Sequence, residues 1–120
     1  MPRSPVAYLA DIVEACAAIR SYLLDVDLDA YRSTRAVRAA VDREFILIGE
    51  AGASLVRLQP ELASRISHAR RIVDFRSQLA QDYPAINDIV VWTIAVDEVP
   101  VLLEECQAIL AELEPQGRAD

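Results

Sequence analysis

An arginine and a tyrosine near residue 80 are the side chains of this sequence best suited to chemistry. Arg76 lies on the apolar stripe of a helix predicted over residues 61–83, at a position that packing alone would make apolar. A charged group there needs a partner or a wet cleft. Tyr83 precedes Pro84, which disfavours helical backbone at Tyr83, so its ring should leave the bundle. The alternative is that Arg76 only reaches solvent from the edge of the stripe.

Four arginines form a local basic cluster between residues 65 and 76. Arg65, Arg70, Arg71 and Arg76 stand against Asp74 alone, in a chain whose formal net charge is -7. The overall acidity argues against bulk attraction to nucleic acid, because that mode requires several basic side chains on phosphates. From the residues alone, the cluster is most simply a solvated helix face.

The remaining segments predict a helical frame around this region. Ser4 and Pro5 can start a helix over residues 5–24, with apolar residues at three- and four-residue intervals. Residues 25–34 are acidic and irregular, which indicates a loop with at most one short turn. A central helix is predicted over residues 35–57, and two further helices follow, one capped by Asn87 or Asp88 and one opened by Pro100.

These patterns together predict one all-α domain. We expect an antiparallel bundle of four long helices with a short fifth piece over residues 1–114, and a frayed tail over residues 115–120. No apolar run approaches the roughly 20 residues of a membrane span, and the N-terminus lacks the apolar core of a signal peptide. We therefore expect a cytoplasmic protein that is not attached to a membrane.

Cysteine, histidine and tryptophan usage narrows the chemistry further. Cys16 and Cys106 each lie among apolar residues, which favours buried thiols over a disulfide. One histidine and no paired-cysteine motif argue against a metal site, and nothing in the sequence indicates a cofactor. Trp92 lies within an apolar helix and is expected in the core rather than as a platform for stacking a base.

Residues 75–92, FRSQLAQDYPAINDIVVW, resemble the signature of the HepT-like ribonuclease toxins, which belong to the HEPN superfamily of helical domains. Three other segments resemble the family as well. Residues 8–12, YLADI, are similar to its opening Y-L-x-D-I, residues 40–43 with 48–51 to its A-V-x-R…I-G-E-A, and Val99-Pro100 to the L-P that opens its last helix. The resemblance covers roughly residues 5–110, in the order of the family.

The resemblance implies a metal-independent endoribonuclease with an R-x4-H-x-Y motif. In that motif histidine moves the proton while the ribose 2′-hydroxyl attacks the phosphate, and arginine stabilises the anionic phosphorus. Here Arg76 is kept, Gln81 occupies the histidine position and Ser77 replaces the usual asparagine. A glutamine amide cannot move a proton near neutral pH, a loss that typically costs about 10²- to 10⁴-fold in rate. The resemblance thus implies a weak or inactive nuclease.

Further residues acquire roles by the same resemblance. Arg70, Arg71 and Ser77 become candidates to face RNA phosphate. Arg43 and Glu50 share one helix face, and they are either an ordinary solvent-facing pair or groups that line the cleft. Tyr83 resembles the tyrosine that a minimal nucleotidyltransferase antitoxin modifies with adenylyl groups, which would block RNA by bulk and charge. Otherwise Tyr83 is a helix-end tyrosine with its hydroxyl in water.

The spacing of the motif has a consequence for assembly. Arg76 and Gln81 are five residues apart, about 140° on an ideal helix, so they cannot face one phosphate within one straight helix. Either the helix distorts, or the pair converges across a two-fold homodimer, and the family resemblance favours the homodimer. Two functions follow from the sequence: the toxin component of a HEPN/nucleotidyltransferase toxin–antitoxin pair, or a non-catalytic HEPN module that binds or regulates a partner.

Overall fold

Six helices make up the described part of the chain. The computed structural model describes residues 4–67, 74 and 88–113, and no strand occurs among them. In chain order the helices are α1 (Pro5–Tyr22), α2 (Leu28–Ser33), α3 (Arg35–Leu58), α4 (Pro60–Ala63), α6 (Asp88–Asp97) and α7 (Val99–Leu113). The predicted all-α class is confirmed.

The first helix begins where its sequence predicts. The Ser4 hydroxyl accepts a hydrogen bond from the Ala7 N–H at 3.2 Å, and Pro5 occupies the first turn, where its missing N–H costs nothing. One face of α1 is buried, and it consists of Leu9, Ile12, Ala15, Cys16 and Ile19. The helix ends at Tyr22, slightly before the predicted end at residue 24.

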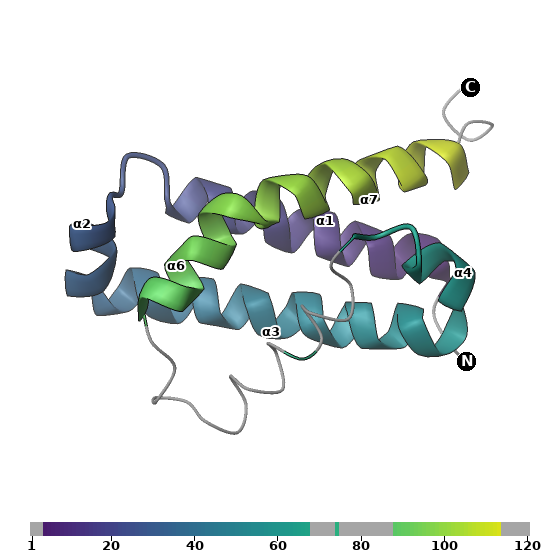
Figure 1. Ribbon diagram of the computed structural model, residues 1–120, viewed down its shortest axis with the longest axis horizontal. Coiled ribbons are helices and arrows are strands. Elements are labelled where there is room, and N and C mark those ends of the chain that lie inside the picture. The colour runs from purple at the N-terminus through teal and green to yellow at the C-terminus, as the bar shows by residue number, and fades with distance from the viewer. Residues whose placement is uncertain (1–3, 68–73, 75–87, 114–120) are drawn as a thin grey trace.

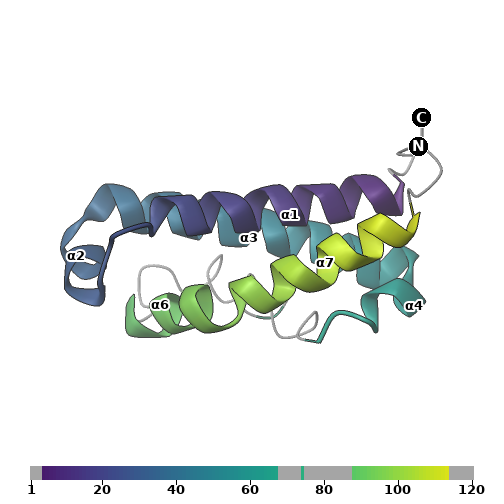
Figure 2. The same cartoon turned by 90° about the horizontal axis from the view of Figure 1, so that it is seen from above.

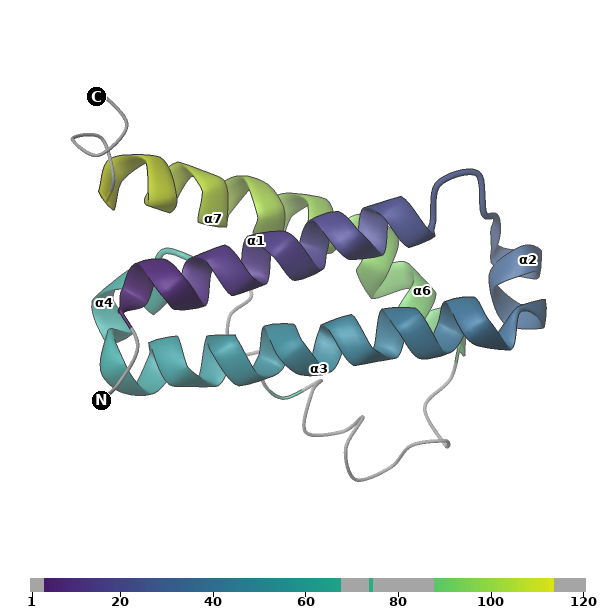
Figure 3. The same cartoon turned by 180° about the vertical axis from the view of Figure 1, so that it is seen from behind.

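α1 lies between α3 and α7 (Figure 3), and it contacts both of them along its length. α2 joins α1 to α3 at one end of the molecule, and α4 follows α3 at the other end (Figure 1). α6 and α7 form one bent path that returns along α1 (Figure 2). The core is built from the inward faces of these helices, and its largest fully buried side chains are Tyr31, Phe45, Leu9, Ile12, Ile19, Ile48, Leu55 and Ile109.

The acidic segment predicted as a loop contains a six-residue helix, α2. Its first turn is capped by Asp27, whose Oδ1 accepts a hydrogen bond from the Ala30 N–H at 2.8 Å. Tyr31 is only 1% exposed, and its ring lies 5.5 Å from the ring of Trp92. The buried tyrosine therefore anchors a helix whose other side chains are mostly polar. Trp92 packs against the core, as predicted.

The predicted helix over residues 61–83 is wrong over residues 64–67. α4 ends at Ala63, and turns follow through Ser67. The Ser64 hydroxyl donates to the Glu61 carbonyl at 2.6 Å, which helps to close the turn. Asp74 is helical, while residues 68–73 and 75–87 lie outside the described residues, as do the predicted tail and the domain end at residue 114.

Two smaller findings concern buried positions. Cys16 and Cys106 are both buried and free, as expected from their apolar neighbours. Gly49 and Gly52 are buried in α3, the helix that packs most extensively on α1. Glycine there costs roughly 1 kcal/mol relative to alanine, and its small size suits a close approach of two helices.

Among the described helices, none is both long and apolar enough to cross a bilayer.

Candidate functional site

Of the residues assigned to the site from the sequence, only Arg43 lies in the described part of the chain. It is exposed on α3. The other assigned residues are outside the described residues, namely Arg70, Arg71, Arg76, Ser77, Gln81 and Tyr83. Their roles stay predictions. The structure does describe the residues that bound this motif-bearing segment, residues 68–87, on both sides.

At its leading end, the motif-bearing segment follows a turn that is fixed to α7. The Ser67 N–H donates to Oε1 of Glu105 at 3.0 Å, and the Ser67 hydroxyl donates to Oε2 of the same carboxylate. Arg65 forms a hydrogen-bonded ion pair with Glu112, which follows Glu105 by seven residues in α7. This hydrogen bond and the charge of Arg65 lower the pKa of the Glu112 carboxyl.

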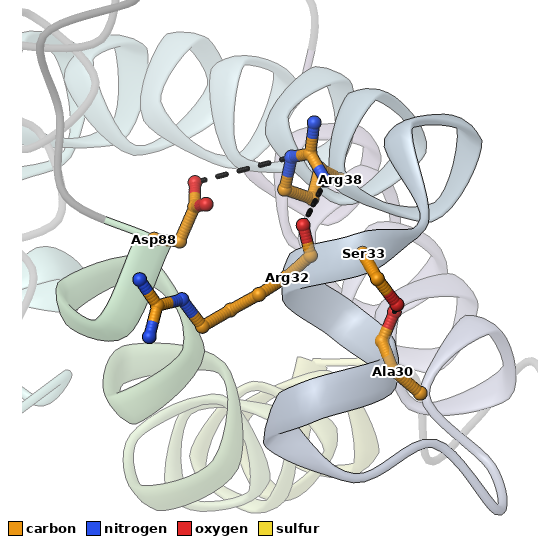
Figure 4. Close-up of polar contacts among 5 residues, drawn as sticks. All are labelled: Ala30, Arg32, Ser33, Arg38 and Asp88. Atoms are coloured by element: carbon orange, nitrogen blue, oxygen red, sulfur yellow. Dashed lines mark hydrogen bonds and ion pairs between the residues drawn. The ribbon is translucent and has the colours of Figure 1, made fainter.

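At its trailing end, the segment enters α6 beside a group of charged residues from three helices (Figure 4). Nη1 of Arg38 donates to the carbonyl of Arg32, and Nε of Arg38 lies 4.0 Å from Oδ1 of Asp88. Arg38 thus connects the end of α2 with the first turn of α6. The side chain of Arg32 points toward Asp88 in the same view.

Asp42, one turn after Arg38 in α3, has an unusual pKa. The pKa of its carboxyl is raised from 3.8 to about 6, because partial burial and the nearby Asp88 carboxylate raise it by more than the Arg38 cation lowers it. Asp42 is therefore a carboxyl that can change charge close to neutral pH. Its sequence context, an ordinary helical position, gave no signal of this.

An acidic groove of about 400 Å³ lies between α1 and α3. Its lining side chains are Tyr8, Asp11, Glu14, Ala15, Glu44, Leu47, Glu50, Ala51 and Ser54. The Tyr22 hydroxyl donates to Glu44 at 3.3 Å nearby. Four of the lining side chains are carboxylates, namely Asp11, Glu14, Glu44 and Glu50. Glu50 lines this groove, whereas Arg43 is not among its lining residues.

The two thiols are unsuited to nucleophilic chemistry. Burial raises the pKa of Cys16 and of Cys106 to about 12, so both stay protonated near neutral pH. No cluster of three or more potential metal ligands occurs within residues 4–67 and 88–113. The described residues thus border the motif-bearing segment on both sides, and the site residues assigned within that segment stay predictions.

The fold and the framed segment define a helical-bundle protein whose candidate chemistry sits between α4 and α6. A family model described as Ribonuclease HepT-like matches residues 12–109, most of the chain. The protein therefore belongs to the HepT-like ribonuclease family. The match extends from α1 to α7 and includes the motif-bearing segment, so it agrees with the resemblance found in the sequence.

Curated relatives of similar length come from Methanocaldococcus jannaschii. “Putative RNase MJ0125” is 26% identical over 117 residues, covering 95% of this chain and 98% of the relative. “Putative RNase MJ1216” is 24% identical and “Putative RNase MJ0127” is 27% identical, each covering 95% of this chain and 94% of the relative. No solved structure matches the chain significantly.

The raised pKa of Asp42 predicts a pH-dependent stability. Because its pKa in the folded chain, about 6, is above the ordinary 3.8, the folded state binds the proton more tightly than the unfolded state. The free energy of unfolding should therefore fall as pH rises from about 4 to about 6. Asp42→Asn should raise that free energy by about 1 kcal/mol at pH 7.5, after allowance for partial exposure, and leave it nearly unchanged at about pH 3, where the carboxyl is protonated in both states.

Urea unfolding of both proteins at the two pH values measures this difference. Asp97→Asn, the same change at an exposed position of α6, is the matched control and should show no comparable gain at pH 7.5. A gain of equal size at both pH values would contradict the assignment to Asp42.

Proposed function

We propose that this chain is the HepT-like toxin component of a HEPN/nucleotidyltransferase toxin–antitoxin pair, acting in the cytoplasm. It is an endoribonuclease by descent, with weak or no activity because Gln81 stands at the catalytic histidine position. The observation that carries the proposal is the family match over residues 12–109, which spans the motif with Arg76 in place. Relatives that are named as RNases support the same substrate class.

In the proposed chemistry the motif keeps its phosphate-binding residue and lacks its proton-transferring residue. Arg76 supplies a planar guanidinium that pairs with two phosphate oxygens and stabilises charge at phosphorus. Gln81 can donate and accept hydrogen bonds, but it cannot take the proton from the 2′-hydroxyl or return one to the leaving oxygen. Phosphate binding is thus retained in the proposal, and proton transfer is not.

The charge distribution supports a path for RNA along the basic cluster. Arg65 is already paired with Glu112, which leaves Arg70, Arg71 and Arg76 as the arginines proposed to face RNA. Ser77 and Arg43 are proposed to line the same cleft.

We further propose that the protein is a homodimer in which Arg76 and Gln81 converge across the two-fold axis. The 140° separation of the pair on an ideal helix, about five residues at 100° each, supports this arrangement. Exposed apolar side chains of α6 support it too, because Ile89, Val90 and Val96 are 43%, 49% and 46% exposed. A second copy would cover such a surface.

The assembly has a direct test. Light scattering at micromolar concentration should give a mass of about 27 kDa, twice the 13.3 kDa of one chain. A mass equal to that of one chain would contradict the proposed dimer.

The chemistry is tested by restoring the proton carrier. The native chain should cut RNA slowly or not at all, whereas Gln81→His combined with Ser77→Asn should raise the cleavage rate by about 10²-fold or more. Single-turnover cleavage of a labelled RNA measures the rate. Adding Arg76→Ala to the same variant should abolish the gain, because the phosphate loses its cation.

Two outcomes would contradict this account of the site. In the first, the native chain cleaves RNA briskly and Arg76→Ala abolishes that cleavage. Catalysis would then not require a histidine at position 81. If neither form cleaves, the second candidate function gains, namely a non-catalytic HEPN module that binds or regulates a partner. The observation that favours that candidate is Gln81 itself.

Tyr83 is the proposed point of control by the partner. Incubation with ATP and a minimal nucleotidyltransferase encoded beside this chain should add mass in adenylyl steps, because the phenolic oxygen is a nucleophile next to the phosphate path. Mass spectrometry of the intact protein measures the steps. Tyr83→Phe should remove them, and equal modification of that variant would contradict the assignment.

A further inference from the structure

The beginning of α6 contacts two other helices, α2 and α3. α2 contributes Tyr31, whose buried ring lies 5.5 Å from the ring of Trp92 in α6. α3 contributes Arg38, whose Nε lies 4.0 Å from Oδ1 of Asp88 in the first turn of α6 (Figure 4). An aromatic contact and a charged contact, one turn apart in α6, thus hold the same end of this helix.

The charged contact has two acidic side chains around one arginine. Asp42 follows Arg38 by four residues, so both lie on one face of α3. Arg38 is the cation close to Asp42 and to Asp88, and its Nη1 also donates to the carbonyl of Arg32. One guanidinium is therefore shared by two carboxylates and a carbonyl.

The charged groups around Asp42 come from its own helix and from α6. Arg38 and Asp88 are the two charges that act on it. The side chain of Arg32 in α2 points toward Asp88 (Figure 4). On the side of α3 that faces α1, the Tyr22 hydroxyl donates to Glu44. The balance at Asp42 is thus set by one cation and one further carboxylate.

Two partly buried carboxylates that share one cation favour the binding of a proton by one of them. Asp88 lies in the first turn of α6, where the helix dipole attracts a negative charge, whereas Asp42 lies inside α3. The proton is therefore expected on Asp42. Burial and the Asp88 carboxylate do raise the pKa of Asp42 to about 6, against the lowering effect of Arg38.

We propose that a proton on Asp42 holds the first turn of α6 against α2 and α3, and that loss of this proton loosens the same turn. With Asp42 neutral, Arg38 pairs with Asp88 alone. With Asp42 charged, the two carboxylates repel each other and compete for Arg38. The packing of α1 on α3 and α7 is apolar and does not depend on this proton. The device is independent of the proposed function.

Trp92 reports the inferred movement, because it is the only tryptophan of the chain and follows Asp88 by one turn of α6. Acrylamide quenching of its fluorescence measures how readily the ring is reached from solvent. In the intact native protein the quenching rate constant should rise about two-fold from about pH 5 to about pH 7.5, as a local opening requires. The midpoint should lie near the pKa of Asp42, about 6. Circular dichroism of the helices should stay constant over this range.

Substitutions of the two partners of Asp42 should move the midpoint in opposite directions. Asp88→Asn removes a negative neighbour and should lower it, whereas Arg38→Gln removes the cation and should raise it. Arg38→Lys keeps the positive charge and should shift the midpoint far less. Asp42→Asn should abolish the transition and keep the quenching rate constant at the value of the native protein at low pH.

Two further variants control for other titrating groups. Asp97→Asn, at an exposed position of the same helix, should keep the native transition. His68→Gln removes the only histidine of the chain, whose ordinary titration range overlaps, and should keep the transition as well. Loss of the transition in either variant would overturn the inference.

Three other results would also contradict the inference. The first is a transition that persists in Asp42→Asn. The second is a fall in helical circular dichroism in step with the quenching, because the whole bundle would then respond to the proton. The third is a shift in the same direction, or no shift, for Asp88→Asn and Arg38→Gln. If Asp42→Asn does not fold, the directions of those two shifts decide, and opposite directions support the inference.

Discussion

The packing of α1 between α3 and α7 is the interaction on which the rest of the structure depends. α3 and α7 make few direct contacts, and each packs extensively on α1. The contacts at the two borders of the motif-bearing segment are made by these helices: Glu105 on α7 binds Ser67, and Arg38 on α3 lies near Asp88. The packing of α1 against both helices thus sets the distance between these two contacts.

Acidic and basic side chains are unevenly distributed along the chain. Four carboxylates lie in the groove between α1 and α3, whereas the arginines of residues 65–76 lie in the chain that follows α4. Acidic residues also make contacts at both borders of the motif-bearing segment: Glu105 of α7 binds Ser67, and Asp88 of α6 lies near Arg38. A net charge of -7 is compatible with a site for an anion, because part of the negative charge pairs with other residues of the frame, as at Glu105, Glu112 and Asp88.

Much of the frame could be predicted because it follows from caps and periodicity. Ser4 with Pro5 starts α1, the apolar stripe of α3 extends from Val37 to Val56, and α6 ends just before Pro100. α2 was missed as a helix because its stability comes from one buried residue, Tyr31, and a single side chain has no period. The break after Ala63 was missed because the local sequence pattern there is helical.

In that case the spacing of Leu62 and Ile66 is helical, and Ile66 is indeed buried, but it lies in a turn. The contacts of Ser67 and Arg65 with α7 fix that turn, and no local pattern reveals a partner so distant in the chain. Roles for the site residues could be predicted only through resemblance, apart from Arg76, whose charge interrupts the predicted apolar stripe. The raised pKa of Asp42 depends on Asp88 and on burial, which a sequence does not display.

Mixed dimers test most directly the central claim, that one site is built from two copies of the chain. The native chain carries Arg76 without a histidine, and the Arg76→Ala, Gln81→His variant carries a histidine without the arginine. Neither homodimer should cleave RNA. After unfolding and joint refolding, the mixture should cleave, because a mixed dimer brings the arginine of one copy to the introduced histidine of the other. An inactive mixture, measured beside an active Gln81→His homodimer, would show that both groups act within one chain and would contradict the account.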